Sequence, residues 1–203
     1  MTRPLLSLCL ATLALLGGCS LLPDAEPVQT FLLPSSQAQA SDRAAPLPHS
    51  LGIARPQARL VLDSTRIAVI PQGSEISSYK GARWSDPAPA LLRDRLLEAF
   101  QADGRFATLS SAEQHLQSDF LLVGNLLAFQ SEYRGGKPEI AIRLDARLVR
   151  SSTQRVVASH SFVVRQPSDA VEIPAVVAAF GQAGDQLAEQ LVRWTASQMQ
   201  NQP

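Results

Sequence analysis

The stretch from Asp119 to Arg165 constrains the fold of this chain most, because it predicts three consecutive strands. Residues 119–130 are apolar on both faces of an extended chain, which is typical of a central strand covered on both sides, at least in part. Residues 140–149 alternate between apolar even positions and mostly polar odd ones, as a half-buried strand does. A turn at Gly135-Gly136 joins these two segments, and residues 156–165 return as a third. The three segments predict an antiparallel meander.

Two other segments predict long helices. The first begins at Asp86-Pro87, where the aspartate offers an N-cap oxygen and proline tolerates the first helical position, and it ends at Gly104. The second runs from Ile173 to about Met199 and presents one apolar stripe, formed by Val176, Phe180, Ala183, Leu187, Leu191 and Trp194. A helix with a single apolar stripe is covered on one side only. We therefore expect an α+β fold, a two-layer sandwich in which a mainly antiparallel sheet carries both helices on one face.

The N-terminal half of the expected domain, which spans residues 28–203, holds shorter signals. Residues 34–50 are rich in serine, alanine, glutamine and proline, so they bury little and predict a mobile loop. A short apolar run lies at 51–54, and residues 57–62 favour a turn of helix. Strands are predicted at Val28–Leu33, Arg66–Ile70 and Ile76–Tyr79, with a further short one at Arg105–Leu109.

The N-terminus predicts a lipid anchor at Cys19. Arg3 and an apolar stretch of about twelve residues precede the run Leu16-Gly17-Gly18-Cys19, and such a stretch is shorter than the roughly 20 residues that span a bilayer. This arrangement resembles the bacterial lipobox, which implies removal of residues 1–18 and acylation of Cys19. Residues 19–27 then form a short polar tether. The alternatives are a secretory cut that leaves Cys19 as a free thiol, or an uncleaved anchor helix.

The predicted compartment is the periplasmic side of the outer membrane. Residue 20 is serine, whereas an aspartate after the lipidated cysteine resembles the inner-membrane retention signal of enteric bacteria. Cys9 lies in the removed signal, so the mature chain has one cysteine and forms no internal disulfide. Without Arg3, seventeen basic side chains balance eighteen acidic ones, which gives no reason to expect a nucleic-acid partner.

No catalytic or metal-binding motif stands out. The sequence holds no nucleophile elbow, phosphate loop or zinc-protease motif, and its histidines, His49, His115 and His160, follow no ligand spacing. His160 lies between two serines, but neighbours on a strand point to opposite faces, which disfavours a nucleophile–base pair. Asp145 lies between Arg143 and Arg147, which indicates either charge compensation on a solvated face or a partner-binding face. We expect no cofactor.

The stretch Pro56–Phe106 resembles the ABC-type transport auxiliary lipoprotein family. Its most specific part is the segment Tyr79-Lys80-Gly81-Ala82-Arg83-Trp84-Ser85-Asp86-Pro87, which follows Ser78 and precedes the leucine-rich helix. The lipobox, the opening strand, the meander and the final helix fit the same plan. One departure is Phe31, where the opening strand of the family often has tyrosine.

The resemblance implies a non-catalytic lipoprotein that works with an ABC permease, an ATPase and a mammalian-cell-entry-domain protein in lipid transport between membranes. It implies no catalytic residues. Tyr79, Arg83 and Trp84 are candidate partner-binding residues, because such residue types are enriched in interface hot spots. The alternative for both aromatic residues is a core role. The competing functions are a structural or envelope-assembly lipoprotein and a cell-wall hydrolase, and homo-oligomerisation stays open.

Overall fold

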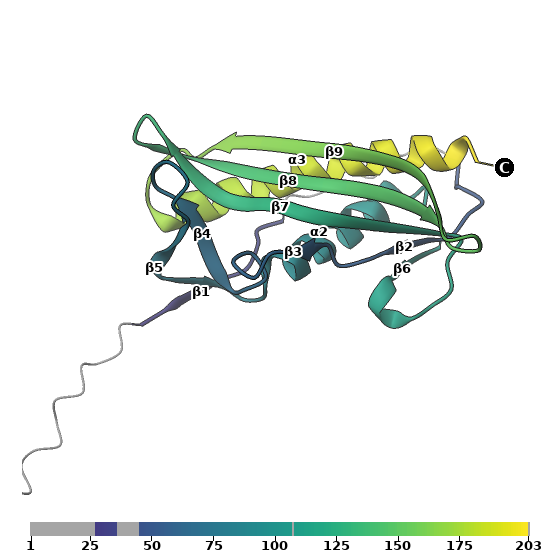
Figure 1. Ribbon diagram of the computed structural model, residues 1–203, viewed down its shortest axis with the longest axis horizontal. Helices are drawn as coiled ribbons and strands as arrows, with labels where there is room; N and C mark the ends of the chain where they lie inside the picture. Colours follow the sequence, from purple (N-terminus) through teal and green to yellow (C-terminus); the bar gives the residue numbers. More distant parts are fainter. Residues whose placement is uncertain (1–26, 36–44, 107, 203) are drawn as a thin grey trace, which may run out of the picture.

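One mixed sheet and two long helices make up the computed structural model of this chain (Figure 1). It describes residues 27–35, 45–106 and 108–202. The helices are α2 (Ala88–Asp103) and α3 (Ile173–Gln200), and a short 3-10 helix η1 spans Ala112–Gln114. The strands are β1 (Gln29–Phe31), β2 (Leu51–Ile53), β3 (Gln57–Ala58), β4 (Arg66–Ile70), β5 (Ser77–Trp84), β6 (Leu109–Ser111), β7 (Phe120–Arg134), β8 (Lys137–Arg150) and β9 (Arg155–Pro167).

The long strand β7 organises the sheet. Along one edge it pairs in parallel with β2, β3 and β4 in turn, in registers that place Leu51 opposite Phe120 and Val69 opposite Ser131. Along its other edge it pairs antiparallel with β8 over nearly its whole length. Strand β3 is held in the sheet through β7, whereas β2 also pairs with β6 and β4 with β5.

The expected antiparallel meander is confirmed, but the sheet as a whole is mixed. The three longest strands, β7, β8 and β9, pair antiparallel, and positive φ angles at Gly135 and Gly136 form the first turn. Five of the eight strand pairings within the described ranges are nevertheless parallel, including β1 with β5 and β2 with β6. These parallel partners are separated by long connections, as parallel pairing requires.

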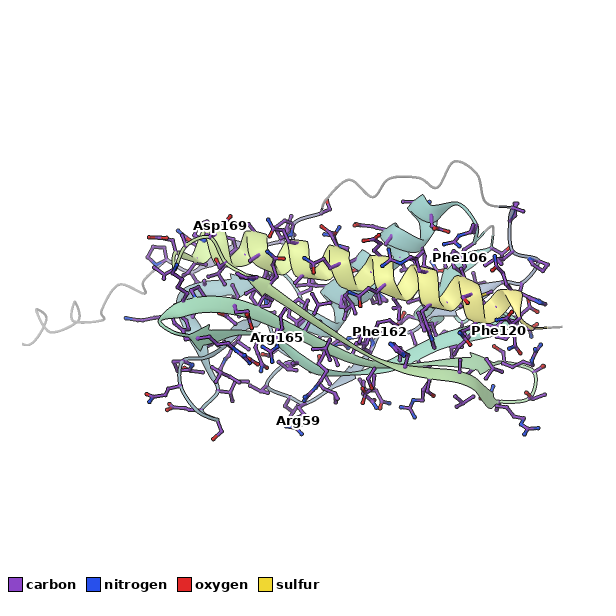
Figure 2. All side chains as sticks on the ribbon, turned by 90° about the horizontal axis from the view of Figure 1, so that it is seen from above. Arg59, Phe106, Phe120, Phe162, Arg165 and Asp169 are labelled. Atoms are coloured by element: carbon purple, nitrogen blue, oxygen red, sulfur yellow. The ribbon has the colours of Figure 1, made fainter. Side chains whose placement is uncertain are left out.

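Both predicted helices are present, and both lie on the same side of the sheet. Figure 2 shows α3 along one face and Arg59 on the opposite side. Helix α2 ends at Gly104, whose φ of 77° is the left-handed conformation expected there. The predicted N-cap is wrong: the cap position is Pro87, and no side chain caps the first turn. The stripe of α3 is buried from Val176 to Leu191.

Three short segments differ from the sequence-based expectation. The strand expected at Arg105–Leu109 begins only at Leu109, as β6. Residues Gln57–Ala58 form a strand rather than a turn of helix, because they add to the edge of β7 opposite Asn125 and Leu126. The expected loop at 34–50 is held firmly near its end, since Leu47 is buried and its N–H donates to the carbonyl of Arg105 at 2.8 Å. Residues 36–44 lie outside the described ranges.

Candidate partner-binding site

The predicted lipidation site lies outside the described residues, so Cys19 stays a prediction. Neither of the described helices is long and apolar enough to cross a membrane. Within residues 27–35, 45–106 and 108–202, no group of three or more histidine, cysteine or carboxylate side chains is placed to hold a metal ion.

The family-like segment begins on strand β5, which lies between β1 and β4 at one end of the sheet (Figure 1). The register places Arg66 opposite Arg83 and Ala68 opposite Ser78, so residues 79–82 bulge out of the pairing with β4. Gly81 supplies the φ of 72° that this bulge needs. Tyr79 lies in the bulge, whereas Arg83 and Trp84 follow it.

Trp84 belongs to the core. Its side chain is 1% exposed and meets Phe129 of β7 and Phe180 of α3 edge-on, with ring centroids 6.1 and 5.1 Å away. A side chain enclosed between the sheet and a helix cannot contact a partner while the domain is folded. The structure therefore corrects the partner-binding hypothesis for Trp84 and supports its alternative, the core role.

Tyr79 is half-buried on the same side of the sheet. Its hydroxyl lies 3.1 Å from Oγ of Ser131 on β7. Burial raises the pKa of Tyr79 to about 12, although the hydrogen bond with Ser131 acts in the opposite direction. The phenol therefore stays protonated at physiological pH and ties the bulge to β7.

Arg83 is exposed on the other side. It precedes Trp84, and neighbouring strand residues point to opposite faces, so its side chain lies on the face away from the helices. Its Nε donates to Oγ1 of Thr30 on β1 at 3.0 Å. The ion pairs among the described residues do not include Arg83. Of the three candidates on this segment, Arg83 is the most exposed and Trp84 is buried.

We name the side of the sheet opposite α2 and α3 the open face. Strands β7, β8 and β9 form a shallow pocket of about 640 Å³ there, lined by Asn125, Asp145, Ala146, Arg147, Ser159, His160 and Ser161. Asp145 accepts a hydrogen bond of 2.6 Å from the Ser161 hydroxyl. The His160 ring instead contacts Phe162 and Trp194 on the helix side. Ser161 and His160 therefore form no nucleophile–base pair.

One end of the open face carries a closed ion-pair cluster near the β7–β8 turn. Arg165 of β9 bridges Glu132 and Glu139 at 3.0 and 2.9 Å. Burial raises the pKa of Glu132, but hydrogen bonds from Arg165, Gln130 and Arg134 outweigh it and leave that pKa below its usual value. These two carboxylates are thus already paired within the chain.

Sequence reasoning missed Arg95, which is 5% exposed between α2 and α3. It forms ion pairs with Glu98 and Asp185 and donates to the backbone carbonyls of Leu33 and Pro34. We name residues 32–35, which follow β1, the strap. The sequence does hold a signal for this contact: Arg95 lies among the apolar residues of α2, where a cation needs partners within the fold.

Comparison with known proteins gives one family. A family model described as the ABC-type transport auxiliary lipoprotein component matches residues 31–192. An uncharacterised protein of Bradyrhizobium diazoefficiens is 31% identical over 147 residues, which are 72% of this chain. The aligned part spans only 39% of that relative's length.

Two solved structures share the fold. The crystal structure of protein XCC0632 from Xanthomonas campestris, assigned to the family DUF330, has a TM-score of 0.79 and 34% identity. The match covers 85% of this chain and 97% of that one. A second, uncharacterised protein has a TM-score of 0.66 at 15% identity, over 84% of this chain and 99% of that one, and supports the fold alone.

Proposed function

Since this chain belongs to the family of ABC-type transport auxiliary lipoprotein components, we propose that it is anchored through Cys19 to the inner leaflet of the outer membrane. From there it binds the mammalian-cell-entry-domain protein of a lipid transport system. In this role it supports lipid traffic between the two membranes and catalyses no reaction. The family match over residues 31–192 is the observation that carries this proposal.

The geometry of the domain supports a binding role. The helices cover one face of the sheet, and the other face presents exposed polar and basic side chains, including Arg83 of the family-like segment. The serine and histidine that adjoin on β9 are each engaged elsewhere, on opposite faces. An auxiliary protein needs such a surface and needs no reactive centre.

A binding experiment with the full-length lipoprotein tests this function. The protein is held in detergent micelles, and the periplasmic portion of the mammalian-cell-entry-domain protein from the same bacterium is titrated against it. We expect saturable binding in the micromolar range or tighter. No association at tens of micromolar, together with a normal outer-membrane lipid composition in a deletion strain, would overturn the transport role.

The membrane assignment has its own test. Cell envelopes are separated into inner and outer membranes, and the protein is located in the fractions. We expect it in the outer membrane, and we expect a Ser20→Asp variant to shift toward the inner membrane in a bacterium that reads this signal. Recovery of the wild-type protein in the inner membrane would refute the outer-membrane location.

A further inference from the structure

The open face carries a row of arginines that runs across the sheet from Arg83. The register places Thr30 opposite Arg83, and Arg83 opposite Arg66 of β4. Counting back along β4 and β7 from the pair Val69–Ser131 brings Arg66 opposite Ala128. The row thus continues onto the next strand of the sheet.

The same row crosses the meander. Ala128 lies opposite Arg143 of β8, which lies opposite Val163 of β9. Neighbouring strands are about 4.8 Å apart, so Arg83, Arg66 and Arg143 fall within about 15 Å of one another along this line. Since Ala128 is small, no bulky side chain separates Arg66 from Arg143.

All members of the row point to the open face. Ile142 and Leu144, on either side of Arg143, are buried in the core. Ile67, which follows Arg66, and Trp84, which follows Arg83, are buried there as well. Because successive strand residues alternate between faces, the three arginines project together away from α3.

These cations lack carboxylate partners within the described part of the chain. The ion pairs found there include none of Arg66, Arg83 and Arg143, nor Arg147 beside the pocket. The nearby acidic groups are already engaged. Glu132 and Glu139 pair with Arg165, and Asp145 accepts from Ser161.

We propose that this row, together with the adjoining pocket at Asn125, Asp145 and Ser161, binds an acidic segment of the transport partner. The proposal rests on the proposed function, and charge complementarity supports it. An arginine guanidinium forms bidentate hydrogen bonds with a carboxylate. Three arginines in a row can therefore hold three carboxylates of one peptide segment. Asp145 and the pocket hydroxyls supply acceptors for backbone or side-chain N–H groups of the same segment.

A protein segment fits this face better than an anionic membrane does. The pocket beside the row holds a carboxylate and hydroxyls that can pair with the N–H groups of a peptide, which a lipid phosphate does not offer. The exposed arginines are few and interleaved with neutral side chains such as Ser159 and Ser161, whereas membrane-binding surfaces rely on dense basic clusters.

The test uses a charge reversal with a matched control. The double variant Arg66→Glu/Arg143→Glu reverses two members of the row. The control, Arg155→Glu/Arg193→Glu, makes the same charge change at exposed arginines on the β8–β9 turn side and on α3. We expect the first variant to weaken binding of the mammalian-cell-entry-domain protein at least tenfold and the control to change it less than about twofold. Equal effects of the two variants would overturn the proposal.

Two further experiments ask whether the arginine row binds an acidic peptide or an anionic membrane. A fluorescent deca-glutamate peptide serves as an acidic probe, and it decides the charge preference even if the transport partner does not bind. We expect the wild-type protein to bind it, with salt weakening the binding, and the Arg66→Glu/Arg143→Glu variant to lose it. Absence of peptide binding to the wild-type protein would contradict the proposal.

Vesicles of phosphatidylglycerol and phosphatidylcholine are the second arm, with a Cys19→Ser protein that carries no lipid. We expect little binding. If the Arg66→Glu/Arg143→Glu variant lost a strong vesicle association but kept partner binding, the open face would be a membrane contact and the proposal would be wrong.

Discussion

The carbonyl oxygen of Pro34 lies against the bare backbone of Gly181 on α3, where a Cβ atom would approach it to 2.9 Å. The strap therefore crosses the helix at a residue without a side chain. At the same crossing, the buried guanidinium of Arg95 donates to that carbonyl and to the carbonyl of Leu33. Gly181 and Arg95 together fix the segment that joins β1 to residues 36–44.

Replacing Gly181 with alanine should displace the strap. Alanine favours a helix over glycine by about 1 kcal/mol, but the new methyl group meets the carbonyl oxygen and ring of Pro34 at 2.9 and 3.1 Å. We expect a net loss of about 1–3 kcal/mol in the free energy of unfolding. Urea denaturation measures this loss, and hydrogen exchange at residues 31–35 should become faster.

Gly184 is the matched control on the same helix. A Cβ there finds its nearest neighbours at 3.8 and 3.9 Å, which is ordinary contact. Gly184→Ala should therefore be neutral or stabilise the protein by up to about 1 kcal/mol. Equal effects of the two substitutions would show that the strap does not press on α3.

Truncating Trp84 should cost stability rather than partner affinity. Trp84→Ala removes the ring that contacts Phe129 and Phe180, so we expect the free energy of unfolding to fall by about 3–5 kcal/mol. Trp84→Phe should cost less, because the indole N–H has no hydrogen-bond acceptor among the described residues. Thermal and urea melts give the comparison.

Arg83→Ala is the counterpart on the open face. This side chain is exposed and makes one hydrogen bond, to Thr30. The free energy of unfolding should therefore fall by less than about 1 kcal/mol. Binding of the partner should weaken. A large loss of stability in Arg83→Ala, or none in Trp84→Ala, would contradict the assignment of the two residues to opposite faces.

Asp119 should make stability depend on acid pH. Hydrogen bonds from the Ser50 hydroxyl and the Ser50 N–H, each 2.7 Å long, hold its pKa below the usual 3.8. Because the folded pKa is lowered, the stabilisation is complete above the unfolded value and is lost as pH falls through the folded one. Urea melts should show Asp119→Asn less stable than wild type near pH 7, with the difference shrinking below about pH 4.

The variant Ser50→Ala tests whether the hydrogen bond from Ser50 lowers the pKa of Asp119. Without the hydroxyl donor, the Asp119 pKa should rise toward its usual value, and the dependence on acid pH should weaken. Glu132, whose pKa is also lowered, contributes in the same direction in every variant and so cancels in the comparison. An unchanged difference between Asp119→Asn and wild type across the acid range would argue against the Ser50 contact.

Cys19 should carry the lipid. Intact-mass analysis of the membrane-extracted protein should show loss of residues 1–18 and addition of a diacylglyceryl group and an acyl chain. Cys19→Ala should leave the membrane, because the anchor contributes about 0.8 kcal/mol for each buried methylene group. An unprocessed N-terminus at Met1 would defeat this prediction.

The sequence predicted the elements whose side-chain pattern is local. The stripe of α3 and the alternation of β8 follow directly from residue order, and both are confirmed. The parallel pairings were beyond reach, because β3 is two residues long and becomes a strand only through contact with Asn125 and Leu126 of β7. Its local pattern resembles a helical turn, and a distant partner overrides it.

The sequence predicted which residues belong to the candidate site but not which way their side chains face. Tyr79, Arg83 and Trp84 are close in sequence, but whether each faces the core or solvent depends on the bulge around Gly81. Neither residue type nor spacing reveals that bulge. Arg66 and Arg143 escaped notice because only the sheet register brings them into line with Arg83.

Strands β2, β3 and β4 all pair with one edge of β7, and this arrangement limits the order in which the sheet can form. An exported chain emerges with its N-terminus first, so the apolar strand Leu51–Ile53 reaches the periplasm well before Phe120. Until residues 120–134 follow, β3 has no strand to pair with, and β2 and β4 have only β6 and β5. Parallel pairing across such separations is slow. The buried side chains of Leu51 and Ile53 therefore stay without their final cover until the β7 segment is available.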